Sequence, residues 1–107
     1  MMNPTPFEKK VYAACSRIRK GRVSTYAEIA KAIGNPKAPR AVGNALNRNP
    51  YKTVPCHRVV RSDGRIGGFA RGTGNKEKML RSEGVGIMKG MISGFGRAFQ
   101  PLQKPLG

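Results

Sequence analysis

The reactive residues of this sequence are the adjacent pair Cys56-His57, which follows Pro55 and precedes a short apolar run. His57 is the only histidine in the chain. A cysteine attacks electrophiles only as the thiolate, and its ordinary pKa of about 8.5 keeps it mostly protonated at neutral pH. An imidazole that removes the proton, directly or through a water molecule, makes the thiol a nucleophile. The pair therefore suggests nucleophilic catalysis.

A carboxylate would orient this imidazole and stabilise its charged form. Glu83 is the best candidate, because it follows an apolar helical stripe and so can point inward. The other acidic residues have other expected places: Glu8 and Glu77 in solvent, Glu28 in a helix cap and Asp63 in a turn. Adjacent side chains do not normally face each other. The residues alone thus leave open that Cys56 and His57 are ordinary half-buried residues at the start of a strand.

The charge balance points to a polyanionic partner. Twenty-one lysines and arginines face five acidic residues, for a net charge of +16. Nucleic acid is the first candidate, because clustered cations release counterions from phosphates. An anionic membrane surface is the second, although no long basic amphipathic helix supports it; a merely well-solvated surface is the third. No apolar run can span a bilayer and no secretory signal is evident, so we expect a cytoplasmic protein.

The elements that must hold the Cys-His pair are mostly helical. A helix is predicted over 7–19, with Cys15 on its apolar face as a small buried residue. Thr25 and Glu28 form a capping-box signal that begins a second helix, which Gly34-Asn35-Pro36 ends. A third helix begins near Pro39. Its outward stripe is small, polar and cationic: Arg40, Gly43, Asn44 and Asn47. This pattern indicates a DNA-binding helix-turn-helix, although any helical hairpin with a solvated outer face would look similar.

The second half of the chain reads as a hairpin, a loop, a helix and a tail. We predict strands over 58–61 and 65–66 around the turn Ser62-Asp63-Gly64, a glycine-rich loop over 67–74, and a helix over 75–82 that Asn75 caps. Residues 87–107 are interpreted as a loosely ordered basic tail rich in Gly and Pro. The fold class is thus mainly α with a short β-hairpin, a small winged helix-turn-helix-like domain over 1–86. One histidine and two distant cysteines predict no metal site, and we expect no cofactor.

The motifs together resemble one family. "STYAEIAKAIGNP" at 24–36, "RAVGNALNRNP" at 40–50, "PCHRVV" at 55–60, "GGFARG" and a Glu-Gly after a helix stand in the order found in the C-terminal domain of O6-alkylguanine-DNA alkyltransferases. The resemblance covers about residues 7–86. It implies DNA repair by direct, stoichiometric transfer of an alkyl group from O6 of guanine to Cys56.

The resemblance implies a role for each matching residue. His57 would deprotonate the thiol through a water, with Glu83 completing the relay. Asn49 would be the hinge between the helix-turn-helix and the active-site loop, and Tyr26 would assist base extrusion and donate toward guanine N3. Arg40 would fill the gap in the base stack. The remaining expected DNA contacts are Ala41, Gly43, Asn44, Tyr26, Arg58 and Arg71, and the expected substrate pocket comprises Val54, Pro55, Phe69 and Ala70.

The partner implied is double-stranded DNA containing O6-alkylguanine, bound through its minor groove, and no membrane. We expect a monomer, with cooperative assembly on DNA as an option, associated with the nucleoid or, in a eukaryote, located in the nucleus. Two alternatives remain. Alkyltransferase-like proteins bind and flip alkylguanine for another repair pathway without chemistry, and typically carry Trp or Ala where this chain has Cys56. A helix-turn-helix regulator would bind DNA regardless of the lesion.

Departures from the family pattern predict a narrower substrate range. The 107 residues lack the large N-terminal domain of many members, which leads us to expect lower stability and repair efficiency. The stretch 51–54 is one residue shorter than in many members, Phe69 stands where tyrosine is frequent, and Gly68 is also unusual. Arg71 adds a bulky cation at the pocket rim. We therefore expect benzylguanine in DNA to react more slowly than methylguanine; equal single-turnover rates for the two would refute this.

Overall fold

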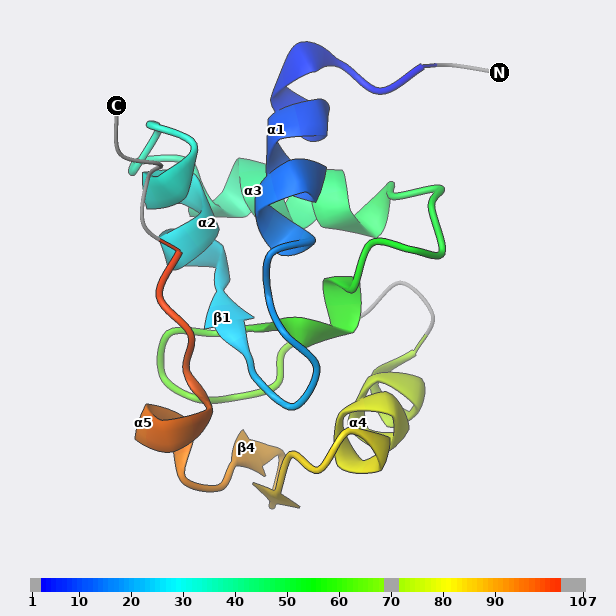
Figure 1. Cartoon of the computed structure of the whole chain (residues 1–107), viewed down its shortest axis with the longest axis vertical. Coiled ribbons are helices and arrows are strands. Elements are labelled where there is room, and N and C mark those ends of the chain that lie inside the picture. Colours follow the sequence, from blue (N-terminus) through cyan, green and yellow to red (C-terminus); the bar gives the residue numbers. More distant parts are fainter. Residues whose placement is uncertain (1–2, 69–71, 103–107) are drawn as a thin grey trace.

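The computed structural model describes residues 3–68 and 72–102. In chain order its elements are α1 (Pro6–Cys15), β1 (Ser24–Thr25), α2 (Tyr26–Ala32), α3 (Pro39–Asn47), the 3-10 turn η1 (Cys56–Arg58), β2 (Val59–Val60), α4 (Thr73–Ser82), β3 (Ile87–Met88), β4 (Met91–Ile92) and α5 (Phe95–Ala98). Helices α1, α2 and α3 gather at one end of the molecule, and α4, β4 and α5 lie at the other (Figure 1). The predicted class, mainly helical with short strands, is confirmed.

Helix α1 begins with a complete capping box. The Thr5 hydroxyl accepts from the Glu8 amide at 3.1 Å, and Glu8 Oε1 accepts from the Thr5 amide at 2.9 Å. Glu8 Oε2 also pairs with Arg48 Nε at 2.9 Å. The prediction that Glu8 faces solvent is therefore wrong, since it is buried. The helix ends at Cys15 rather than at residue 19, because tight turns follow in which Ile18 N donates to the Cys15 carbonyl.

The two helices of the predicted helix-turn-helix are α2 and α3. Thr25 caps α2 by accepting from the Glu28 amide at 3.0 Å, as predicted, and Pro39 opens α3. The Glu28 carboxylate does not complete the expected box, because Oε2 accepts from the Leu102 amide at 2.8 Å instead. Gly34, with φ of 82°, turns the chain between the helices. The motif is thus held in place from outside by the C-terminal segment.

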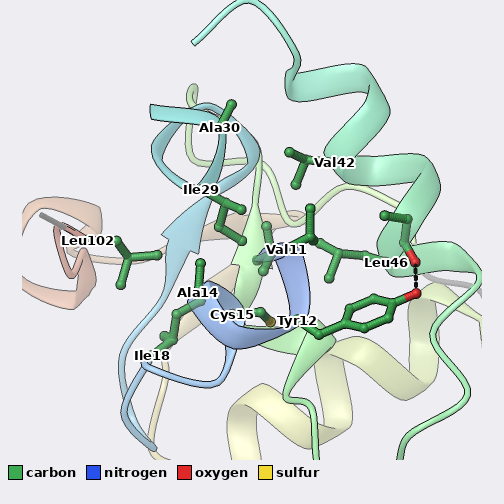
Figure 2. Packing of buried hydrophobic residues seen from close by; sticks show 12 residues of the cluster. Val11, Tyr12, Ala14, Cys15, Ile18, Ile29, Ala30, Val42, Leu46 and Leu102 are labelled. Carbon is green, nitrogen blue, oxygen red and sulfur yellow. Dashed lines mark hydrogen bonds between the residues drawn. The ribbon is translucent and has the colours of Figure 1, made fainter. Parts of the chain in front are cut away.

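The first core cluster joins α1, α2 and α3 (Figure 2). Its fully buried members include Val11, Ile29 and Val42, one from each helix. The Tyr12 hydroxyl crosses this core and donates to the Ala45 carbonyl at 2.7 Å. Cys15 has no exposed surface and belongs to this cluster, which confirms its predicted place in the core. Packing of α1 against α3 thereby fixes the position of α3 relative to the rest of the domain.

The strands pair differently from the predicted hairpin over 58–66. β2 pairs in parallel with β1, Ser24 opposite Val59 and Thr25 opposite Val60. The predicted turn exists, since Arg61 N donates to the Arg65 carbonyl at 2.9 Å. Arg65, however, forms its bridge with Met91 of β4, and the antiparallel hairpin of the described chain is β3–β4. Val59 and Val60 are completely buried, so β2 lies in the interior beside β1.

Residues 87–102 fold back onto the domain, so the prediction of a loosely ordered tail is wrong for them; 103–107 lie outside the described residues. β3 and β4 contribute Ile87 and Ile92 to a second core cluster, and Leu102, 1% exposed, reaches the first. Gln100 N donates to the Val23 carbonyl at 2.7 Å, and the Arg22 guanidinium donates to two carbonyls near the end of α5. Figure 1 shows this segment running from α5 up to the first turn of α2. Glycine turns interrupt its apolar residues, which hides them from a search for periodicity.

We expect Leu102→Ala to lower the free energy of unfolding by about 2–5 kcal/mol, because it leaves a cavity in the first core. The matched control in the same segment is Met88→Ala, whose side chain is 68% exposed and should change stability by less than about 0.5 kcal/mol. Urea titration followed by circular dichroism measures both. Equal, small effects would show that the C-terminal segment adds nothing to the core.

Candidate active site and DNA-binding groove

Cys56 begins η1, directly after the buried Pro55. Its Sγ accepts from Asn49 Nδ2 at 3.0 Å and lies 3.8 Å from the Leu46 carbonyl, at the end of α3. Asn49 also holds the next turn, since its side chain accepts from the Tyr51 amide and donates to the Tyr51 carbonyl. Cys56 as a residue is half-buried rather than sealed in the core. An amide donor at 3.0 Å favours the anionic form of the sulfur.

His57 lies inside the domain and faces Glu83 at the end of α4. Nε2 is 3.1 Å from Glu83 Oε1, although the ring N–H is not aligned well enough on that oxygen for a hydrogen bond. Arg58 binds the same carboxylate with two hydrogen bonds, Nε to Oε1 at 2.9 Å and an Nη to Oε2 at 2.7 Å. Because Nε2 faces the carboxylate, Nδ1 is the ring nitrogen left to accept a proton.

The charges around His57 suit a general base. Burial lowers the pKa of His57 below its ordinary value, and the neighbouring Glu83 opposes that change only in part. The hydrogen bonds from Arg58 hold the pKa of Glu83 below its ordinary range. At neutral pH the imidazole is therefore neutral and the carboxylate is ionised. A neutral imidazole can take a proton, and the carboxylate stabilises the imidazolium that results.

Cys15 and Cys56 are neighbours that differ in burial: Cys15 is completely buried and Cys56 is half-buried. Cys56 packs against the core cluster that contains Cys15. The hydrogen bond with Cys56 and complete burial both raise the pKa of the Cys15 thiol. Cys15 is therefore a neutral thiol beneath the reactive sulfur, as expected of a structural cysteine.

Lys76 is the residue that the sequence analysis missed. Its side chain is completely buried, and Nζ donates to the carbonyls of Val59 at 2.7 Å and Gly68 at 3.2 Å. It lies 5.9 Å from the centre of the Tyr26 ring. No carboxylate of the described chain pairs with it. Burial lowers its pKa to about 8, and the nearby Cys56 is the strongest influence in the opposite direction.

The position of Lys76 could have been found from spacing. It precedes the buried Leu80 by four residues and Glu83 by seven, so all three share one face of α4. The residue type argues against this inward position, because lysines are rarely fully buried. The predicted start of this helix was also late. α4 begins at Thr73 after Gly72, whose φ is 98°, and Asn75 lies in its first turn.

A groove of about 790 Å³ lies between α3 and the segment that follows β2. Residues of α3 line one side: Pro39, Arg40, Gly43, Asn44 and Asn47. Arg61 and Gly68 line the other, and Tyr26 lies between. A Cβ on Gly43 would be in ordinary contact with the Tyr26 ring, at 3.7 Å, so the ring lies close to α3 at this residue. The volume is large enough for a nucleotide base, and none of the described lining residues is acidic.

The predicted site residues divide by place. Arg40, Ala41 and Asn44 are exposed on α3, and Gly43 is half-buried against Tyr26. Val54 is half-buried beside the first core cluster. Phe69, Ala70 and Arg71 lie outside the described residues. Cys56 is not among the described residues that line the groove. Tyr26 connects the groove with the surroundings of Cys56, because it lines the groove and is close enough to Cys56 to feel its charge. Burial, and after it Cys56, raises the pKa of Tyr26.

Arg58 is not placed as predicted for a DNA contact. Its side chain is only 16% exposed, and its hydrogen bonds go to groups inside the domain: both oxygens of Glu83 and the Ile18 carbonyl, the latter at 2.9 Å. Sequence position beside Cys56 suggested a surface cation, but η1 turns this side chain toward α4. We correct its role to that of a residue that fixes Glu83 beside His57.

No helix within 3–68 or 72–102 is long and apolar enough to cross a membrane. Over the same ranges, no three His, Cys, Asp or Glu side chains gather closely enough to hold a metal ion.

Comparisons with known proteins give matches over most of the chain. A family model described as the DNA-binding domain of 6-O-methylguanine DNA methyltransferase matches residues 6–85. A methylated-DNA–protein-cysteine methyltransferase of Methanosarcina acetivorans is 53% identical over 81 residues, which make up 75% of this chain and 52% of that protein. The chain spans about half the length of the curated relatives it matches.

Two kinds of solved structure are similar to the chain. Atl1 of S. pombe, in complex with damaged DNA containing O6-carboxymethylguanine, has a TM-score of 0.81 at 34% identity, over 92% of this chain and 98% of that one. OGT of Mycobacterium tuberculosis in complex with DNA has a TM-score of 0.73 at 39% identity, over 78% of this chain and 52% of that one. The C-terminal segment is thus included more fully in the match to Atl1.

Proposed function

This chain belongs to the family of the 6-O-methylguanine DNA methyltransferase DNA-binding domain, and we propose that it repairs DNA by moving an alkyl group from O6 of guanine to Cys56. The observation that carries the proposal is the assembly around the sulfur. The Asn49 side-chain amide donates to Sγ of Cys56. Nε2 of the adjacent His57 lies beside the ionised carboxylate of Glu83. A regulator that only binds DNA has no use for this arrangement.

The first step is eversion of the damaged nucleotide. A stacked base keeps O6 out of in-line reach of a sulfur, and flipping costs a few kcal/mol that pocket contacts must offset. Arg40 enters the gap from the first turn of α3, where it is exposed at the mouth of the groove. Small residues on the same helix, Ala41 and Gly43, allow α3 to approach the minor groove closely. Tyr26 then contacts the everted base.

The second step is the displacement itself. His57 Nδ1 takes the proton of Cys56, directly or through a water, and Sγ attacks the alkyl carbon attached to O6. The S–C bond forms as the C–O6 bond breaks, and the bonding electron pair leaves with guanine. Tyr26 gives its hydroxyl proton to N3 of the departing base, and the proton that His57 took from the thiol restores the hydroxyl. Methylguanine and thiol thus become guanine and thioether.

Lys76 supplies the positive charge that this step requires. Both the thiolate and the departing guanine are anions, and a fixed cation in a water-poor site stabilises such charge more than one in water does. Lys76 also ties the Val59 carbonyl, just after η1, to the Gly68 carbonyl on the groove wall. It therefore acts both by charge and by joining the two halves of the site.

The thioether has no good leaving group, so each protein molecule acts once. We expect incubation of excess DNA containing O6-methylguanine to restore one guanine per molecule of protein and then stop. Base composition after acid hydrolysis measures this ratio, and Cys56→Ser is the control that should restore none. Continued turnover, or no guanine from folded wild-type protein, would contradict the proposal.

A second candidate is a protein that binds the lesion without chemistry. The match to Atl1 over 92% of this chain favours it, since the shared architecture includes the C-terminal segment. Cys56 and His57 favour the transferase. Tight binding to methylguanine DNA with unchanged protein mass would select this candidate.

The partner and location follow from the proposal. We expect double-stranded DNA to be bound by a monomer through the minor groove, with cooperative assembly on long DNA as an option, in the cytoplasm with the nucleoid or, in a eukaryote, in the nucleus. Sedimentation of the protein alone and with duplexes of increasing length measures these states.

A further inference from the structure

The groove carries a cation on each side. Arg40 lies on the α3 side, and Arg61 lies on the side formed by the segment after β2. Arg40 already has a part in the proposed eversion, whereas Arg61 has none. Arg61 also lines a neighbouring hollow of about 370 Å³ that Ser62 and Asp63 share. Its side chain therefore stands between two sites.

Gly67 brings Arg61 and Tyr26 together. A Cβ at residue 67 would lie 3.3 Å from Arg61 Cγ and 3.6 Å from the Tyr26 hydroxyl. With φ of 74°, Gly67 also adopts a backbone that other residues rarely take. The arginine stem thus packs over a bare stretch of backbone next to the hydroxyl. The charge of Arg61 is felt there, since it opposes the rise that burial causes in the pKa of Tyr26.

The guanidinium of Arg61 makes only a weak ion pair in the described structure. Its ion pair with Asp63 is 3.9 Å long, and the two side chains are 56% and 49% exposed. An exposed pair at this distance contributes little, because water and salt screen it. Asp63 is shared with Arg65, whose Nε is 3.7 Å away, and Asp63 Oδ1 also accepts from the Arg65 amide. Arg61 can leave Asp63 at small cost.

We propose that Arg61 binds a backbone phosphate next to the everted nucleotide, and that Asp63 holds its guanidinium in the free protein. This inference rests on the proposed function and adds a second cationic contact to it. An everted nucleotide keeps a phosphate on each side, and the phosphate closest to the Tyr26 hydroxyl comes within range of Arg61. A planar guanidinium matches phosphate oxygens in bidentate geometry. No acidic side chain of the described groove lining competes there.

The test measures binding of a methylguanine duplex in a Cys56→Ser background, where no transfer occurs, at several salt concentrations. One phosphate contact contributes about 0.9 to the slope of log K against log salt, which is about fivefold in affinity at 0.15 M salt. We expect Arg61→Gln to lose both. Arg65→Gln is the matched control: it pairs with the same aspartate and is 64% exposed, but lies outside the groove. Equal changes in slope for the two variants would overturn the proposal.

A double-mutant cycle tests the part assigned to Asp63. Asp63→Asn keeps an oxygen for the turn and removes the charge, so it should strengthen DNA binding when Arg61 is present and have a smaller effect with Arg61→Gln. The same gain in both backgrounds would contradict competition for Arg61. Transfer from the free O6-methylguanine base separates this inference from the proposed function. That substrate has no phosphate, so its transfer to Cys56 in the wild-type protein tests the chemistry alone: no transfer would contradict the proposed function, whereas transfer together with an unchanged salt slope in Arg61→Gln would contradict only the phosphate contact.

Discussion

Replacing Lys76 with methionine is expected to slow methyl transfer from DNA by about 30-fold while leaving the protein folded. A unit charge within about 8 Å of an anion is worth about 2 kcal/mol at an effective dielectric constant of about 20, and this energy corresponds to the stated factor. Lys76 is close enough to Cys56 for that residue to influence its pKa. Methionine keeps the length and apolar stem of the side chain but carries no charge.

Stability separates this electrostatic role from a structural one. A pKa lowered from 10.5 to about 8 means that burying the charged lysine costs on the order of 3 kcal/mol at neutral pH. Methionine removes that cost but leaves the carbonyls of Val59 and Gly68 without their donor, at about 1–3 kcal/mol each. The opposing contributions should keep thermal unfolding of Lys76→Met near that of the wild type.

The pH dependence gives an independent readout for Lys76. Between pH 8 and 10.5 the unfolded chain retains a proton that the folded protein has released, so wild-type stability should rise with pH over this interval. In the same protein the transfer rate should fall as pH rises through about 8, because Lys76 loses its charge. Both trends should be absent in Lys76→Met. The exposed Lys78→Met on the same helix is the control, and a folded Lys76→Met with the wild-type rate would refute the role.

The second large effect is expected from Glu83→Gln. It breaks a mostly buried ion pair with Arg58 and leaves His57 without its carboxylate, so we expect a loss of about 3 kcal/mol of stability, near the lower end for such pairs. The transfer rate should fall on the order of 100-fold, because a positioned general base contributes about 10²–10⁴. Rapid-quench kinetics on methylguanine DNA, carried out where the variant is folded, measures the rate.

The acid limb of the pH–rate profile shows whether Glu83 acts through His57. Glu83 raises the pKa of His57, so its removal should move this limb to lower pH. Loss of folded protein alone would lower the rate without moving the limb. The stability gap between wild type and variant should narrow as pH falls below about 4.5, because the pKa of Glu83 is depressed in the folded state and the unfolded chain takes up the proton first. Glu77→Gln, which breaks only the exposed pair with Arg81, should change neither the rate nor the limb.

Features encoded by neighbouring residues could be predicted from the sequence. The Thr25 cap, the Pro39 helix start and the burial of Cys15 each depend on residues within a few positions, and the structure confirms them. The approach of Glu83 to His57 was also accessible, because the residue lies on the inward face of a helix. Local chemistry and helical period were sufficient for these features.

Features made by distant segments could not be predicted in this way. The pairing of β1 with β2 joins residues about 35 positions apart, and the contact of Glu28 with Leu102 links the helix-turn-helix to a segment without visible period. Arg58 was predicted to contact DNA because it follows the Cys-His pair. Its actual partner, Glu83, is evident only when the position of α4 is known. The inward position of Lys76 on α4 follows from spacing, but its carbonyl partners, Val59 and Gly68, lie in segments that helical period does not place.

The central claim is tested most directly by the mass of the peptide that contains Cys56 after the protein meets a duplex with one O6-methylguanine. Transfer predicts that this peptide gains one methylene, CH₂, in proportion to the guanine restored, and that the Cys15 peptide gains none. An unmodified Cys56 peptide from protein bound tightly to the lesion, or the added mass on any other residue, would contradict the account.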